Sequence, residues 1–341
     1  MPVSLFLRDR LSGGRRAGQE ARRPRTDHVR RPSMQPSDPT MTTGQWAQLV
    51  LLSILWGGTF ILTVPALQGF APVALVAWRL SIAALTLLVI CGWLGLSLHP
   101  LIAHGPRLLL LAVLNNAVPF FLISTGQTVI GAGLASIFNS TTPLWTALIA
   151  AFIFGNETLK GMKLAGISMG ILGVAVLIGP AALSGLGGPP WAMACFVGAA
   201  ISYGFGANLA RGLGDLPPVL IATGQCLCSS VLVMIAALLT VGPGGLISDD
   251  GAAIASIITI GTAMTAGAYL LYFNLIAKAG ATNGSLVTIL IPVSAILAGI
   301  VLFGETMTAN GWMGFALISF GLLMIDGRLF KKRTRRVTPV P

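Results

Sequence analysis

Charged side chains are almost absent from the long central part of this chain. Between Trp46 and Asp326 stand six basic residues, Arg79, Arg107, Lys160, Lys163, Arg211 and Lys278, and six acidic ones, Glu157, Asp215, Asp249, Asp250, Glu305 and Asp326. The uncharged windows between them reach about 20 residues, the length of helix that crosses a ~30 Å hydrocarbon layer. Charged residues make up 9% of the chain, against roughly 25% in an average soluble domain. The sequence therefore predicts an integral membrane protein.

Two stretches about 149 residues apart repeat one pattern. Pro143–Thr158 reads PLWTALIAAFIFGNET and Pro292–Thr306 reads PVSAILAGIVLFGET. In each, Pro opens an apolar run that closes with Phe-Gly and then Glu-Thr, and Gly follows the Glu nine and sixteen residues later. Repetition at half the chain length, in so apolar a sequence, favours a membrane transporter built from two copies of one unit.

Apolar runs separated by Gly- and Pro-rich turns predict an all-α protein with ten transmembrane helices. The predicted spans are residues 46–64, 71–93, 108–125, 131–154, 163–180, 191–210, 218–241, 252–276, 284–303 and 310–327. We expect spans 1–5 to form a first repeat over residues 44–180 and spans 6–10 a second repeat over 181–327.

The basic residues predict the orientation of these spans. If both termini are cytosolic, five connections face outward, and none of them contains Lys or Arg. These connections are residues 65–70, 126–130, 181–190, 242–251 and 304–309. In that case 20 of the 21 basic residues lie on the cytosolic side, as the positive-inside rule requires. Because each repeat has five spans, an odd number, the second repeat must be inverted relative to the first.

The two termini carry most of the positive charge. Nine of the 21 basic residues precede residue 32 and six more lie from Arg328 onward, so the net charge of +11 belongs mainly to two tails. We interpret residues 1–43 as a disordered cytosolic tail, with Met34 or Met41 as alternative true starts, and 328–341 as a second basic tail. Anionic lipid headgroups are a better partner for such tails than nucleic acid.

The residues in and around the repeats resemble the EamA family of the drug/metabolite transporter superfamily. The resemblance rests on Trp56-Gly-Gly-Thr-Phe60, on Pro72 followed by Arg79, and on the two Glu-Thr units, and it covers roughly residues 46–327. It implies ten transmembrane helices, a central cavity between the halves, and export or exchange of small metabolites such as amino acids. The second repeat departs from the first, since Gln225 stands where Arg79 is expected and Tyr203 loosely matches Trp56.

Arg79 is the one basic residue inside a predicted span. Burying it costs about 2.5–3.5 kcal/mol on insertion scales, and such residues usually face a cavity or a partner. One interpretation is an anchor for a substrate carboxylate or phosphate, which a guanidinium binds through two parallel hydrogen bonds. The alternative is that Arg79 reaches the membrane interface or caps backbone carbonyls.

Uncharged polar residues inside the spans are further candidates for binding substrate. They are Asn115, Asn116, Tyr203, Gln225, Tyr269 and Tyr272. Pro119 follows Asn115-Asn116, so we expect a broken helix with free backbone groups there. Tyr269 and Tyr272 share one helix face. Each of these side chains could instead join neighbouring helices by hydrogen bonds.

Glu157 and Glu305 lie at predicted helix ends on opposite sides of the membrane. They could latch the gates at the two faces. Capping of the next helix is favoured, because Thr and a new span follow each Glu closely.

Together these features predict a secondary transporter of the inner or plasma membrane that works by alternating access at a midplane cavity. No nucleotide-binding or enzyme motif is found, so a gradient is expected to drive transport, and neither a cofactor nor a metal ion is expected. A channel-like facilitator and an intramembrane enzyme are the alternatives. The oligomeric state is left open, with a homodimer as one alternative.

Overall fold

The structure is a computed structural model that describes residues 41–155, 158–183, 189–279, 281–284 and 286–326. Regular secondary structure in this part of the chain is helical throughout. Residues 1–40 and 327–341, and with them nearly all of the two predicted tails, lie outside the described residues.

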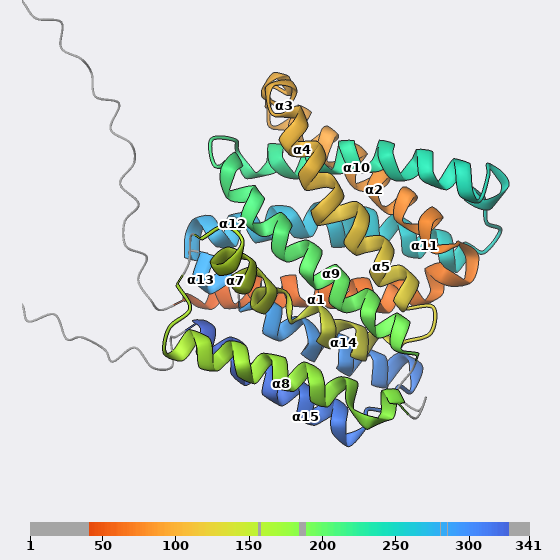
Figure 1. Ribbon diagram of the computed structural model, residues 1–341. Coiled ribbons are helices and arrows are strands. Elements are labelled where there is room, and N and C mark those ends of the chain that lie inside the picture. Colours follow the sequence, from red (N-terminus) through yellow and green to blue (C-terminus); the bar gives the residue numbers. More distant parts are fainter. Residues whose placement is uncertain (1–40, 156–157, 184–188, 280, 285, 327–341) are drawn as a thin grey trace, which may run out of the picture. The chain divides into compact units, whose positions relative to one another are not determined.

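The first repeat contains α1 (Thr43–Gly69), α2 (Pro72–Trp93), α3 (His99–Ala103), α4 (Gly105–Ala112), the π-helical turn η1 (Val113–Ala117), α5 (Val118–Gly126), α6 (Ala132–Asn139), α7 (Thr142–Phe152) and α8 (Met162–Leu183). The second contains α9 (Pro190–Ala210), α10 (Pro218–Thr240), α11 (Gly251–Thr259), the π-helical turn η4 (Ile260–Gly267), α12 (Ala268–Ala279), α13 (Ala281–Gly284), α14 (Val287–Phe303) and α15 (Ala309–Asp326). Two short 3₁₀ turns, Arg211–Leu213 and Gly244–Leu246, complete the chain (Figure 1).

These helices match the ten predicted spans, with spans 3, 4, 8 and 9 made of more than one helical segment. Six of the described helical segments have both the length and the apolar composition needed to cross a membrane. Three shorter apolar helices, Met162–Leu177, Val287–Phe303 and Ala309–Ile325, and the α6–α7 pair make up the other four spans. The prediction of an all-α membrane protein with ten spans is confirmed.

Two predicted helices differ in detail. Span 4 was expected to be continuous over 131–154, but it divides at Ser140–Thr141, where the hydroxyls of both residues donate to carbonyls of the preceding turn. Span 3 was expected to break at Asn115-Asn116, which is wrong. The chain there stays helical and widens into the turn η1, because a wider turn accommodates the ring and the missing N–H of Pro119.

Equivalent helices of the two repeats run in opposite directions. Cys91, near the end of α2, contacts Thr223, near the start of α10, with 3.3 Å between Sγ and Oγ1. The fifth helices α8 and α15 are also antiparallel, because Gly166 lies beside Gly321 while Gly173 lies beside Gly314. Each repeat also has a π-helical turn in its third span. The repeats are therefore inverted, as predicted.

The repeated glycines form the contact between α8 and α15. A Cβ atom at Gly166 would lie 2.6 Å from the carbonyl oxygen of Gly321, and one at Gly173 would lie 3.0 Å from that of Gly314. Such distances leave no room for a side chain, so glycine lets the two backbones approach closely. The four glycines that mark the repeat in the sequence thus have a packing role.

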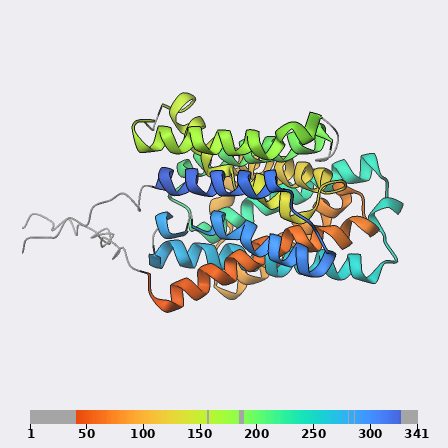
Figure 2. The same cartoon turned by 90° about the horizontal axis from the view of Figure 1, so that it is seen from below.

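Helix α1 begins and α15 ends at one end of the helical bundle (Figures 1 and 2). We call this the terminal end and the other the far end. Arg107 lies at the start of α4, where its Nη1 donates to the carbonyl of Gly212, and Lys278 lies at the end of α12. These basic residues are at the terminal end, whereas Glu305, between α14 and α15, is at the far end.

Candidate functional site

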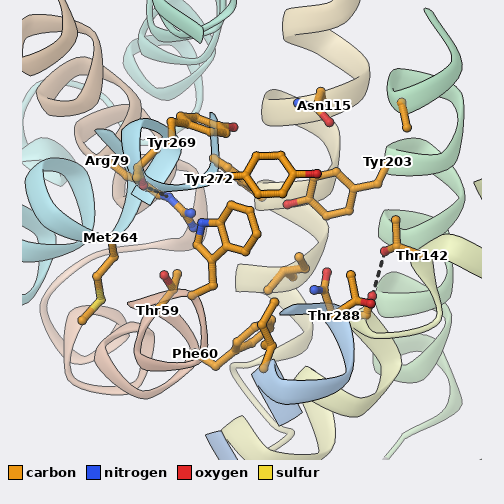
Figure 3. A pocket seen from close by; sticks show the side chains of 17 residues that line it. Thr59, Phe60, Arg79, Asn115, Thr142, Tyr203, Met264, Tyr269, Tyr272 and Thr288 are labelled. Atoms are coloured by element: carbon orange, nitrogen blue, oxygen red, sulfur yellow. Dashed lines mark hydrogen bonds between the residues drawn. The ribbon is translucent and has the colours of Figure 1, made fainter. Parts of the chain in front are cut away.

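A cavity of about 270 Å³ lies between the two repeats (Figure 3). Its wall combines aromatic rings, threonine hydroxyls and amides with one charged side chain. From the first repeat it is lined by Trp56, Thr59, Phe60, Arg79, Asn115, Phe120, Ile123, Asn139 and Thr142. From the second repeat it is lined by Tyr203, Ala207, Met264, Thr265, Tyr269, Tyr272, Thr288 and Ile291.

Arg79 supplies the positive charge of this wall. Its side chain is 8% exposed, its Nε donates to Oγ1 of Thr265 at 3.1 Å, and its guanidinium carbon lies 3.7 Å from the centre of the Phe120 ring. None of the described residues that line the cavity is acidic. A buried cation is costly unless an anion or several acceptors compensate it. An anionic group in the cavity would compensate the charge of Arg79.

The three amides among the predicted substrate-binding candidates divide between the cavity wall and a layer behind it. Asn115 lines the cavity and donates from Nδ2 to Oε1 of Gln225 at 3.0 Å, and Gln225 itself is buried in α10. Asn116 is fully buried and donates to Oγ of Ser229 at 3.1 Å. Gln225 and Asn116 thus hold the third span against α10 rather than facing the cavity.

Three tyrosines bring aromatic surface to the cavity. Tyr272 packs against Trp56 with 5.1 Å between ring centroids, and Tyr203 packs edge-on to Phe120 at 6.4 Å. The hydroxyl of Tyr269 donates to Oδ1 of Asn116 at 3.4 Å, which links the wall to the layer behind it. Rings held in pairs of this kind give a rigid surface on which the apolar body of a ligand can pack.

The structure brings together Arg79, Asn115, Tyr203, Tyr269 and Tyr272 out of the seven predicted substrate-binding candidates. The sequence did not single out Thr265 or Thr288 of the wall, since each looks like any other helical threonine. Asn139 and Thr142, which flank the unexpected break between α6 and α7, were not among these seven candidates, although Asn139 is a polar residue inside predicted span 4. Trp56, Thr59 and Phe60 carried a signal, since all three belong to the motif that resembles the EamA family.

Glu305 caps a helix, but not the one that follows it. Its Oε1 accepts from the backbone N–H of Ala132 at 2.7 Å and its Oε2 from that of Gly133 at 2.9 Å, both at the start of α6 in the other repeat. The following helix α15 is capped by Thr308, whose Oγ1 accepts from the N–H of Gly311. Glu157, the equivalent residue of the first repeat, lies outside the described residues.

His104 and Asp215 join the repeats at the terminal end, 2.9 Å apart between Nε2 and Oδ2. The pKa of His104 is raised above its ordinary value. The larger cause is the hydrogen bond with the Pro100 carbonyl, and the smaller is the hydrogen bond with Asp215. The bond with His104 in turn lowers the pKa of Asp215. The charged pair is therefore present above the lowered pKa of Asp215 and is lost as the pH rises through the raised pKa of His104.

No group of three or more His, Cys, Asp or Glu side chains comes together among the described residues, so none of them suggests a metal centre. Among the described residues that line the candidate site, Arg79 is the one that carries a charge.

Comparison with known proteins relates this architecture to a transporter family. The chain is 29% identical to an inner membrane transporter of Escherichia coli, YedA, whose function is uncharacterized, over 81% of this chain and 89% of that protein. It is 26% identical to a probable amino-acid metabolite efflux pump of Escherichia coli, over 85% of this chain and 96% of the relative. A solved crystal structure with 20% identity superimposes with a TM-score of 0.58, covering 83% of this chain and 96% of that one.

The EamA-like transporter family matches this chain twice, over residues 45–179 and again over 190–326. The two matches cover the two sets of helices that meet around the cavity. This multi-pass membrane protein belongs to the EamA-like transporter family.

Proposed function

We propose that this chain exports or exchanges small metabolites that carry a carboxylate, such as amino acids, by alternating access at the central cavity. The observation that carries the proposal is Arg79, a buried guanidinium on a cavity wall without any acidic residue among the described ones. A carboxylate accepts two parallel hydrogen bonds from a guanidinium and also neutralises its charge. The similarity to a probable amino-acid metabolite efflux pump supports the same substrate class.

The inverted repeats support the alternating-access mechanism. Transporters of this construction bind substrate near the midplane, at the interface between repeats, and open to either side as one repeat moves against the other. The cavity here is lined by residues of both repeats. Substrate would thus contact both moving halves at once, which is what couples its binding to their movement.

Transport by purified protein in proteoliposomes tests this proposal. The panel contains labelled amino acids, other carboxylic acids, and amines that lack a carboxylate. We expect saturable uptake and counterflow for one or more of the carboxylates, and no uptake of the amines. Arg79→Lys keeps the charge but loses the planar fork, so it should weaken carboxylate transport, and Arg79→Gln should abolish it. Arg107→Gln is the matched control, because Arg107 lies at the terminal end away from the cavity.

The results distinguish the competing functions. A linear, non-saturating flux without counterflow would indicate a channel. Normal carboxylate transport by well-folded Arg79→Gln would show that this arginine has a structural role only. Transport of amines in preference to carboxylates would contradict the proposed substrate class.

A further inference from the structure

The short helix α6 connects the far end of the bundle to the central cavity. It begins at Ala132 beside Glu305 and ends at Asn139, which lines the cavity, and Thr142 lines it again where α7 begins. Eight helical residues span about 12 Å. Any movement of α6 therefore changes both the far end of the protein and the wall of the proposed substrate site.

The start of α6 has no cap from its own repeat. The N-cap position is Gly131, which has no side chain to accept a hydrogen bond. The Glu305 carboxylate of the second repeat takes this role through its bonds to Ala132 and Gly133. Helix N-termini carry partial positive charge, so the carboxylate is attracted to this end by charge as well as by hydrogen bonding.

Three glycines make the space that the carboxylate occupies. A Cβ atom at Gly131 would lie 2.7 Å from Oε1 of Glu305, and one at Gly133 or Gly299 would lie 3.1 Å or 2.6 Å from Oε2. Gly131 and Gly133 belong to the first repeat and Gly299 to the second. The cradle is thus assembled from both repeats, and it exists only while α6 is docked.

Among the described residues of the helices that pack against α6, no other charged side chain competes for Glu305. The described residues of α1, α6, α9 and α14 include neither an acidic nor a basic side chain. The packing of α6 against α1, α9 and α14 is otherwise made by small and apolar residues. The carboxylate bonds are therefore the polar part of an otherwise non-polar contact between repeats.

We propose that α6 is the movable gate at the far end of the cavity and that Glu305 is its latch. The inference rests on the alternating-access mechanism proposed above. In the conformation described here the latch is closed, with α6 held against the second repeat. The break at Ser140–Thr141 is the hinge, because the backbone there has already left the regular helix, and hinges are formed by the few residues that absorb such changes. Opening toward the far end requires the carboxylate to leave α6.

Cysteine accessibility tests the latch without knowledge of the substrate. In a variant whose four native cysteines are replaced, Thr59→Cys places a reporter on the cavity wall. An impermeant maleimide applied from the far-end face should label this reporter slowly in the parent protein. Glu305→Ala and Glu305→Gln should each raise the labelling rate at least about threefold, as expected for the loss of a helix cap that holds the closed state.

Asp250→Asn is the matched control. Asp250 is also an N-cap carboxylate in a far-end connection, with Oδ1 accepting from the N–H groups of Ala252 and Ala253, but the helix that it caps follows it directly in the same repeat. Its removal should leave the labelling rate unchanged. Gly131→Ala is a second test, since the added Cβ displaces the carboxylate while Glu305 remains, and it should accelerate labelling in the same way.

Unchanged labelling in the Glu305 variants and in Gly131→Ala would overturn the latch, as would an equal increase in Asp250→Asn. The outcome does not depend on what is transported. Failure of every transport assay together with faster labelling would therefore refute the proposed substrate class and leave the gate intact.

Discussion

At the scale of single residues, the orientation of Arg79 is set by two contacts of different kinds. The Phe120 ring covers one face of the guanidinium, and Thr265 accepts from Nε. Neither contact uses the two terminal nitrogens of the guanidinium, Nη1 and Nη2, which can donate two parallel hydrogen bonds to a carboxylate. A residue that holds Nε therefore acts on substrate binding through Arg79.

Replacing Thr265 by Val should raise KM for a carboxylate substrate by about tenfold while changing kcat less. The acceptor of Nε is lost, and a hydrogen bond to a charged group contributes roughly 1.5–3 kcal/mol. Thr262→Val is the control, because Thr262 lies on the same π-helical turn but donates to the carbonyl of Ile258. Initial-rate transport measurements compare the two variants, and equal KM values would show that Thr265 does not position Arg79.

At the scale of helices, the contact between α8 and α15 depends on the absence of side chains. Gly321 meets the backbone of Gly166 and Gly170 so closely that a Cβ atom would lie 2.6 Å from the Gly166 carbonyl oxygen. Backbone atoms cannot move aside as a flexible side chain can. Substitution at this position must separate the two helices.

Gly321→Ala should lower the melting temperature of the detergent-solubilised protein, since overpacking of a tight contact costs about 1–3 kcal/mol. Gly92→Ala should keep or raise it, because Gly92 is also helical but has open space around it and Ala favours the helix. Thermal unfolding followed by tryptophan fluorescence measures both. A Gly321→Ala protein as stable as Gly92→Ala would contradict the close contact.

At the scale of the whole molecule, the charge pattern and the internal repeat predicted the architecture. Contacts between distant residues and breaks within helices could not be predicted in the same way. Ten spans and their inversion followed from the positions of the basic residues and of the Pro and Gly turns. Arg79 was predictable because it is the one cation inside a span. The capping of α6 by Glu305 was not predictable from the sequence. Its partners Ala132 and Gly133 are 173 and 172 residues away, and spacing along the chain carries no information on such a contact. Helix breaks inside apolar runs are equally hard to see, although Pro143 occupies the first turn of α7, a typical helix start.

The orientation proposed for the molecule places the terminal end in the cytosol. A cysteine at Ile247, which is exposed in a far-end connection, should then react with an impermeant maleimide applied to intact cells. A cysteine at Gly212, exposed at the terminal end, should react only after the membrane is permeabilised. The reverse labelling pattern would place the far end in the cytosol. The proposed α6 gate would then open toward the cytosol and not toward the outside.

The central claim is that Arg79 binds the carboxylate of the substrate, and a thermodynamic cycle tests it most directly. Binding of a transported carboxylic acid and of its uncharged amide analogue is measured by isothermal titration calorimetry, for the parent protein and for Arg79→Gln. We expect the parent to prefer the acid by about tenfold or more and Arg79→Gln to lose that preference, which gives a coupling energy of at least about 1.4 kcal/mol. An equal preference for the acid in both proteins would mean that the carboxylate binds elsewhere.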